Sequence, residues 1–299
     1  MIIPLKRRLG SIITASIAVI IAMVFILNNA EFFTLPKKYD PADKDGCIVH
    51  FIDVGQGDSA IISAGGVNIL IDAGESDRGD DVLLCIKELK INKLDYVIGT
   101  HAHSDHIGGL ETVLSEIEVE NIILSKPPKG FTAELKAYTE LMEAAKKANT
   151  KHIPAKVGDS FDIGKGRLSI IAPISNEYKN LNDLSIVTRF DFGETSFLFT
   201  GDAEAAAERD ILESGANIDT DVIKIAHHGA GTSSCKEFLE AVSPEYAVIE
   251  VGIENTHGHP TPETITRLQS LDAEIYRTDL NGCITAFSDG KDISFTAKK

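Results

Sequence analysis

The segment from Thr100 to His106 holds three imidazoles and a carboxylate within six positions, in the order His101, His103, Asp105 and His106. Neutral imidazole and carboxylate are common ligands of divalent ions, and a short loop with four of them can serve two neighbouring ions. The alternative is an exposed polar loop. The context favours a metal site, because an apolar strand is predicted at 94–99 and a helix from residue 104 or 105 to about 114.

Residues at the ends of other predicted strands would complete such a site. Asp202 follows a predicted strand at 196–200 and is expected to bridge two ions, although an Asp before a helix can also be a cap. His227 and His228 follow a predicted strand at 222–226. Adjacent side chains point in different directions, so we expect at most one of the two to bind metal and the other to face the substrate. Open sheets place active sites at the carboxyl ends of their strands.

The remaining polar candidates leave two interpretations open. His259 lies in the loop 257–260 and either reaches the site or packs elsewhere, while His50 and His152 are expected to be structural. Acidic residues at strand ends either hold the ligand imidazoles in one tautomer or are ordinary turn residues. These are Asp53, Asp58 and Asp72.

The elements around these residues indicate one α/β domain over residues 46–297. Strands are predicted at 47–53, 58–63, 67–72, 94–99, 119–124, 160–163, 167–171, 185–191, 196–200, 222–226, 246–251 and around 275, 284 and 293. Helices are predicted at 80–89, 104–114, 133–148, after Gly201, at 236–242 and at 262–271. Each half of the domain contributes strands and amphipathic helices. Two sheets packed face to face, with helices on both outer faces, would bury every apolar stripe.

The amino-terminal residues differ in kind from this domain. A basic flank, Lys6-Arg7-Arg8, precedes an uncharged apolar run from Leu9 to Leu27, which as a helix would span about 28 Å, close to a bilayer core. Residues 1–30 therefore predict a cytoplasmic flank and one transmembrane anchor, and residues 31–45 a linker. The positive flank predicts an extracytoplasmic domain on a single-pass cell-membrane protein. The alternative is a cleaved signal peptide and a secreted protein, which Asn28-Asn29-Ala30 favours less.

Charge and cysteine content narrow the classes of partner. The 299 residues carry a formal net charge of −16, so composition gives no sign of a basic groove for long nucleic acids, although bound cations would offset part of the charge. No protein partner is inferred. The four cysteines are widely spaced, and we interpret them as scattered buried thiols rather than a disulfide scaffold. They are Cys47, Cys85, Cys235 and Cys283.

Together these motifs resemble the metallo-β-lactamase superfamily, and more narrowly the hydrolase domain of ComEC-type competence proteins. The resemblance spans residues 46–297 and rests on segments 51–59, 71–74, 101–106, 182–185, 199–202, 227–229 and 258–260. It implies an αββα sandwich and a site with two divalent ions, zinc or manganese, that cleaves phosphodiesters. The residues that match its ligand motifs are His101, His103, Asp105, His106, Asp202 and His228.

Three departures from that family pattern matter. ComEC-type proteins carry the domain beside a multi-helix channel, which one apolar segment does not provide, so DNA translocation does not transfer. They often have a carboxylate where His103 stands. Superfamily members commonly place a His where Asn182 and Asp183 stand, so an amide or a carboxylate is expected to replace it, which would weaken the preference for zinc. The pairing of Asp202 with Glu204 and His228 also resembles the phosphorylcholine esterases of the superfamily.

The expected reaction is hydrolysis of a phosphate ester or a nucleic-acid phosphodiester by a hydroxide that two ions share. Asp105, Asp202 and His227 are the expected catalytic residues, and His227 would contact the phosphoryl oxygens or protonate the leaving group. Hydrolysis of an acyl substrate, a lactam or lactone, is the second interpretation. A membrane-anchored binding module without catalysis is the third.

Overall fold

The computed structural model describes residues 45–253 and 255–298. The predicted membrane anchor and nearly all of the predicted linker lie outside these ranges. Within them, no helix is both long and apolar enough to cross a membrane.

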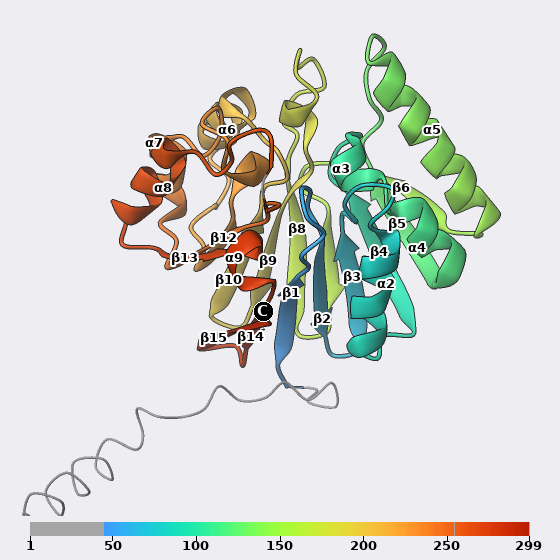
Figure 1. The fold of residues 1–299 in the computed structure, drawn as a ribbon, viewed down its shortest axis with the longest axis horizontal. Coiled ribbons are helices and arrows are strands. Elements are labelled where there is room, and N and C mark those ends of the chain that lie inside the picture. The colour runs from blue at the N-terminus through green and yellow to red at the C-terminus, as the bar shows by residue number, and fades with distance from the viewer. Residues whose placement is uncertain (1–44, 254, 299) are drawn as a thin grey trace, which may run out of the picture. The chain divides into compact units, whose positions relative to one another are not determined.

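Two mixed β-sheets lie face to face at the centre of the domain (Figure 1). The first has eight strands in the order β15 (Ile293–Lys298), β14 (Cys283–Ser288), β1 (Cys47–Phe51), β2 (Ala60–Ala64), β3 (Val67–Ile71), β4 (Lys93–Gly99), β5 (Glu118–Leu124) and β6 (Lys151–Pro154). The second has seven strands in the order β13 (Glu274–Arg277), β12 (Tyr246–Ile249), β11 (Val222–Lys224), β10 (Thr195–Phe199), β9 (Val187–Phe192), β8 (Gly166–Ala172) and β7 (Ser160–Ile163).

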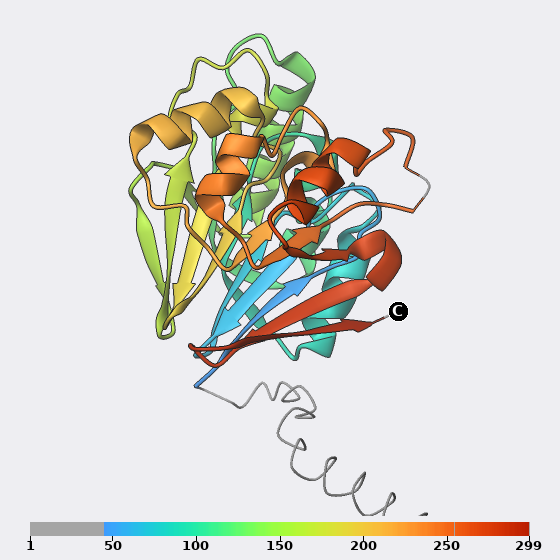
Figure 2. The same cartoon turned by 90° about the vertical axis from the view of Figure 1, so that its left-hand side faces the viewer.

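Helices cover the outer face of each sheet (Figures 1 and 2). The eight-stranded sheet packs against α2 (Gly79–Glu88), α4 (Leu110–Glu116) and α5 (Thr132–Lys147). The seven-stranded sheet packs against α6 (Ala205–Ser214), α7 (Lys236–Val242) and α8 (Pro262–Gln269). Four short helices complete the fold: α3 (Ser104–Ile107), η2 (Asn182–Leu184), η3 (Ala226–Gly229) and α9 (Thr278–Asn281). The expected αββα sandwich is confirmed.

Strand periodicity explains why the two sheets can share a core. Successive side chains of a strand point to opposite faces, so Ile62 and Ile69 face the second sheet while Ile61 and Leu70 face the helices. Phe190 and Phe197 approach from the second sheet, and all of these side chains are buried. Burial of each such side chain stabilises the fold by about 1.5–3 kcal/mol.

The predicted helix at 104–114 is interrupted. It forms α3 and α4, with Gly108 and Gly109 between them. Gly109 N donates to Gly74 O at 3.0 Å, and a Cβ atom at Gly109 would lie 2.2 Å from Ala73 O. The helix breaks here because the chain that follows β3 packs directly on its backbone.

The topology brings the carboxyl ends of several strands together. β3 runs parallel to β4, and β10, β11 and β12 are mutually parallel. The residues that follow these strands are Asp72, Thr100, Asp202, His227, His228 and Glu250. Parallel strands end at the same edge of a sheet, so side chains far apart in the sequence meet there.

Candidate metal centre

Two groups of metal-ligating side chains meet at these strand ends, and Asp202 belongs to both. The first group consists of His101, His103 and Asp202, whose donor atoms lie within 4.8 Å of one another. His101 Nε2 lies 2.9 Å from His103 Nδ1 and 3.8 Å from Asp202 Oδ2.

The second group consists of Asp58, His106, Asp202 and His228. His106 Nε2 and His228 Nε2 lie 3.2 Å and 3.8 Å from Asp202 Oδ1. Asp202 therefore directs Oδ2 toward His101 and Oδ1 toward His106 and His228. A carboxylate that bridges two ions needs this division of its oxygens.

Asp58, a member of this group, and Asp105, which is not, lie on opposite sides of its two imidazoles. Asp105 Oδ2 lies 3.2 Å from His228 Nε2 and 4.0 Å from His106 Nε2, the ring nitrogens that face Asp202. Asp58 instead lies 3.2 Å from His228 Nδ1 and 3.8 Å from His106 Nδ1. Asp105 thus lies on the Nε2 side of the two rings, as Asp202 does, whereas Asp58 lies on their Nδ1 side.

Hydrogen bonds fix the orientation of the two rings. His106 Nδ1 lies 2.8 Å from Asp72 Oδ2, and Asp72 also accepts from Thr100 N at 2.8 Å. His228 Nδ1 donates to Glu250 O at 2.9 Å. A partner on Nδ1 leaves Nε2 free for a metal.

Two of the three strand-end carboxylates, Asp58 and Asp72, therefore contact ligand imidazoles. The third, Asp53, fits the alternative interpretation of an ordinary turn residue. Its Oδ1 accepts from Gly55 N at 3.1 Å, and its own backbone N–H donates to Cys283 Sγ at 3.4 Å. Asp53 is a turn residue.

A buried network of ionisable side chains, which the sequence analysis did not single out, contacts the second group through Asp58. Burial and the nearby Asp58 raise the pKa of one member, Glu250, well above its usual value. Lys224, 2% exposed, forms an ion pair with Asp58. Glu250, 1% exposed, accepts from Ser59 N at 3.0 Å. Both residues could have been found from the sequence, because each is an ionisable residue within an apolar run: Lys224 at 222–226 and Glu250 at 247–251. Buried charges persist when they are paired and hydrogen-bonded.

The carboxylates around the second group favour added positive charge on its imidazoles. Burial lowers the pKa of His106, but the Asp202, Asp72 and Asp58 carboxylates outweigh it and hold that pKa well above its usual value. Burial opposes protonation of His228 too, yet Asp202 and the hydrogen bonds with Asp105 and Asp58 raise its pKa to about 10. Metal binding would displace such protons, because ligand imidazoles must be neutral.

The polar atoms of the site also fit a metal. Within the described residues, His106 Nε2 and Asp202 Oδ1 are buried and have no hydrogen-bond partner. Buried polar atoms rarely stay unpaired. A donor set of imidazole nitrogens and carboxylate oxygens suits borderline and hard divalent ions such as zinc and manganese.

His227 lies between this buried cluster and solvent, with a quarter of its side chain exposed. Its Nε2 lies 3.8 Å from Asp202 Oδ2 and its Nδ1 3.1 Å from Glu204 Oε1. The contact with His227 lowers the pKa of Glu204. Asn182 Nδ2 donates to the same Glu204 oxygen at 2.9 Å. Glu204 and Asn182 therefore contact His227 and belong to neither metal group.

The backbone at His227 and His228 is strained, and the strain turns the two rings apart. Both residues have positive φ, 50° and 53°, a conformation that costs a residue with a side chain about 1–3 kcal/mol. His227 N donates to Gly201 O at 3.1 Å and Ala230 N donates to His227 O at 2.8 Å, which holds the turn.

Two further candidates do not join the metal groups. Asp183 was a candidate replacement for the usual His, but the structure corrects this expectation. Its Oδ1 accepts from Glu204 N and Ala207 N, both at 3.1 Å, so it caps α6. The His259 ring centroid lies 5.4 Å from that of His227, beside it but outside both groups.

Comparison with known proteins places these features in a family. Residues 52–252 match the family model described as the metallo-beta-lactamase superfamily. ComE operon protein 3 of Bacillus subtilis (strain 168) is 32% identical over 254 residues, which are 79% of this chain and 32% of that protein. Competence protein ComA of Neisseria gonorrhoeae is 29% identical over 236 residues, 78% of this chain and 31% of that protein. The chain thus spans about a third of the length of these relatives.

Solved structures share the fold at low sequence identity. CmlA, a diiron β-hydroxylase from Streptomyces venezuelae, has a TM-score of 0.52 at 13% identity, over 84% of this chain and 54% of that one. The metallo-β-lactamase fold protein YhfI from Bacillus subtilis has a TM-score of 0.50 at 14% identity, over 78% of this chain and 96% of that one. At these identities the likeness concerns the fold alone.

The family match includes every residue of the two metal groups, from Asp58 to His228. The sequence motifs, the two sheets with their outer helices and the family model therefore agree, and the chain belongs to the metallo-β-lactamase superfamily.

Proposed function

We propose that this chain is a divalent-metal-dependent hydrolase that cleaves phosphodiester bonds. The observation that carries the proposal is the position of Asp202, which directs one carboxylate oxygen to His101 and the other to His106 and His228. This arrangement supports a site for two ions.

In this proposal, His101, His103 and Asp202 hold one ion, and Asp105, His106, Asp202 and His228 hold the other. Bound ions would lower the pKa of a water molecule and neutralise charge on the phosphoryl oxygens. Asp72, Asp58 and the Glu250 carbonyl keep the ligand rings in place through their Nδ1 atoms. They are positioning groups.

His227 is the group that we assign to proton transfer. It is partly exposed, lies 3.8 Å from Asp202 and is held by Glu204. A protonated imidazole at that place can donate its Nε2 proton to the departing oxygen, and Glu204 would stabilise the charged ring. Asn182 fixes Glu204 by its hydrogen bond.

Support for phosphorus rather than a carbonyl as the reacting centre comes from the relatives. The motifs shared with ComEC-type hydrolase domains imply phosphodiester cleavage, and two similar proteins, competence protein ComA and recombination protein 2, carry names that refer to competence and recombination. Competence and recombination as whole processes are not assigned to this chain, which matches only part of those proteins.

The test compares two chromogenic substrates, bis-p-nitrophenyl phosphate and nitrocefin, with manganese or zinc added. We expect turnover of the phosphodiester, and Asp202→Ala and His228→Ala should each reduce it to background in a folded protein. His227→Ala should reduce it by about 10²–10⁴-fold. His152→Gln, remote from both metal groups, is the matched control and should keep full activity.

Cleavage of nitrocefin without cleavage of the phosphodiester would replace the proposal by acyl hydrolysis. Full activity of Asp202→Ala would remove the metal assignment. A panel of single-stranded DNA, duplex DNA and phosphocholine esters then identifies the class of phosphodiester that is cleaved.

A further inference from the structure

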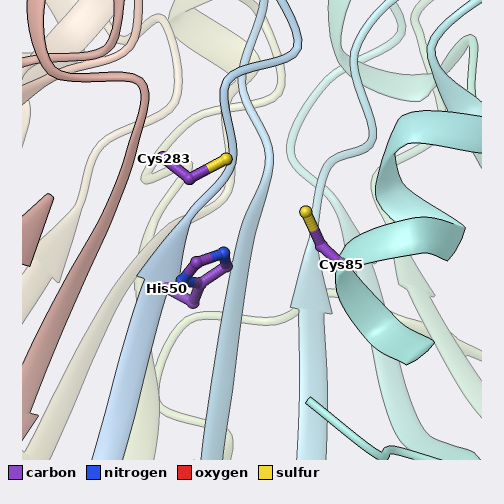
Figure 3. A group of neighbouring side chains, drawn as sticks. All are labelled: His50, Cys85 and Cys283. Carbon is purple, nitrogen blue, oxygen red and sulfur yellow. The ribbon is translucent and has the colours of Figure 1, made fainter. Parts of the chain in front are cut away.

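A separate cluster of metal-ligating side chains lies on the outer face of the eight-stranded sheet. It consists of His50, Cys85 and Cys283. Figure 3 shows the two sulfur atoms directed toward each other and the His50 ring beside them. Their donor atoms lie within 4.8 Å of one another. None of the three residues belongs to the metal groups around Asp202.

The sheet register explains the convergence. His50 of β1 is paired with Thr285 of β14, so these two side chains point to the same face of the sheet. Cys283 lies two residues before Thr285 and therefore points to that face as well. Cys85 approaches from α2, which packs on this face. Three rigid elements thus bring the side chains together.

A hydrogen bond orients the His50 ring. His50 Nδ1 lies 2.6 Å from Thr285 Oγ1, so Nε2 is the ring nitrogen available to a metal. Metal-binding histidines typically have this kind of partner on the second nitrogen. The cluster therefore contains an oriented ligand beside the sulfur pair.

The surroundings leave the cluster open to a ligand. Asp53 N donates to Cys283 Sγ at 3.4 Å, and such a hydrogen bond favours a sulfur that carries negative charge. All three side chains line a pocket of about 600 Å³, so an ion and an external ligand can reach them.

We propose that Cys85, Cys283 and His50 form a zinc site distinct from the Asp202 centre. Two thiolates and one imidazole are a common zinc donor set, and in such sites water or an external ligand takes the fourth tetrahedral position. Thiolates select softer ions than carboxylates do, so this site would prefer zinc over manganese.

A disulfide between Cys85 and Cys283 is the competing chemistry, and an extracytoplasmic location would favour it. Both cysteines are free thiols in the structure. A disulfide would also leave the oriented His50 ring without a role, whereas a metal uses all three donors.

Cobalt(II) tests the proposal, because it replaces zinc and gives a near-ultraviolet thiolate-to-metal absorption that imidazole and carboxylate ligands cannot produce. The full chain is reduced, stripped of metal and titrated with cobalt without oxygen. We expect this absorption in the wild type and in Asp202→Ala. Cys85→Ser and Cys283→Ser should abolish it, and Cys235→Ser, a partly buried cysteine at the start of α7, is the matched control.

Thr285→Val keeps all three ligands and guards against misfolded serine variants. It should weaken cobalt binding by about 10–100-fold, because it removes the partner of His50 Nδ1. The absence of thiolate absorption in the wild type, or its survival in Cys85→Ser, would overturn the proposal. So would an air-purified chain that contains a Cys85–Cys283 disulfide by mass spectrometry and fails to bind cobalt through sulfur after reduction. None of these readouts measures turnover, so all of them are independent of the proposed hydrolase activity.

Discussion

At the scale of single residues, the buried Lys224 shows how the site tolerates its many carboxylates. Lys224 is 2% exposed and pairs with Asp58, which itself lies behind the His106 and His228 rings. Burial lowers the pKa of Lys224, but Asp58 and Glu250 together outweigh this effect and raise the pKa above its usual value. The amine therefore stays charged. Asp58 thus links the His106 and His228 imidazoles to the buried ammonium group of Lys224.

Lys224→Met should lower the free energy of unfolding by about 3–5 kcal/mol, because it leaves Asp58 buried without its cation. Lys93→Met is the matched control. Lys93 pairs with Asp95 and Glu120 near the surface, where solvent screens the charges and an ion pair contributes little to stability. Denaturant unfolding measures both losses.

Adding Asp58→Asn to Lys224→Met should recover part of the lost stability, because it removes the uncompensated carboxylate. If Lys224→Met and Lys93→Met cost the same, the buried pair does not stabilise the site in the way argued here.

At the scale of elements, the close approach of Gly109 to Ala73 sets the position of α3 and of His106, which α3 carries. Gly109→Ala would place a Cβ atom 2.2 Å from a backbone oxygen, which cannot be relieved by a side-chain rotation. We expect a loss of stability of about 1–3 kcal/mol or more, together with weaker manganese binding.

Gly231→Ala is the control for this substitution, because its nearest contact would be an ordinary 3.5 Å. Denaturant unfolding and manganese titration report the two effects. A Gly109→Ala protein with wild-type stability and metal affinity would show that the contact does not position His106.

The same elements show which features of the fold could be predicted from the sequence. The apolar runs before Asp72, His101, Asp202 and His227 marked the strands, so the position of these residues after strand ends was predicted correctly. The αββα architecture followed from amphipathic helices in both halves. These features are local, and local patterns are visible in a single sequence.

Features that depend on distant contacts were not predictable. The break between α3 and α4 arises from packing against residues 73 and 74. Asp183 caps α6 although the hairpin of β9 and β10 separates the two in the sequence. Cys85 and Cys283 are free thiols, as expected, but they are not scattered, because α2 packs on the face of the sheet that carries Cys283. No spacing in the sequence encodes such a contact.

At the scale of the whole molecule, the proposed ions tie the two sheets together. His101, His103, Asp105 and His106 follow a strand of the eight-stranded sheet, while Asp202 and His228 follow strands of the seven-stranded sheet. Ions held between them would bind only the folded chain. The stability of the domain should therefore depend on metal concentration.

Manganese tests this dependence, because it favours the oxygen and nitrogen donors of the Asp202 centre over the cysteine site. At a free concentration about 100 times its Kd, manganese should stabilise the fold by about 2.7 kcal/mol, which raises the Tm by roughly 5–10 °C for a domain of this size. Chelation should reverse the rise. Asp202→Ala should lose it, whereas Cys85→Ser should keep it. An equal rise in Asp202→Ala would mean that manganese binds elsewhere, and the two sheets would then owe their association to the apolar core alone.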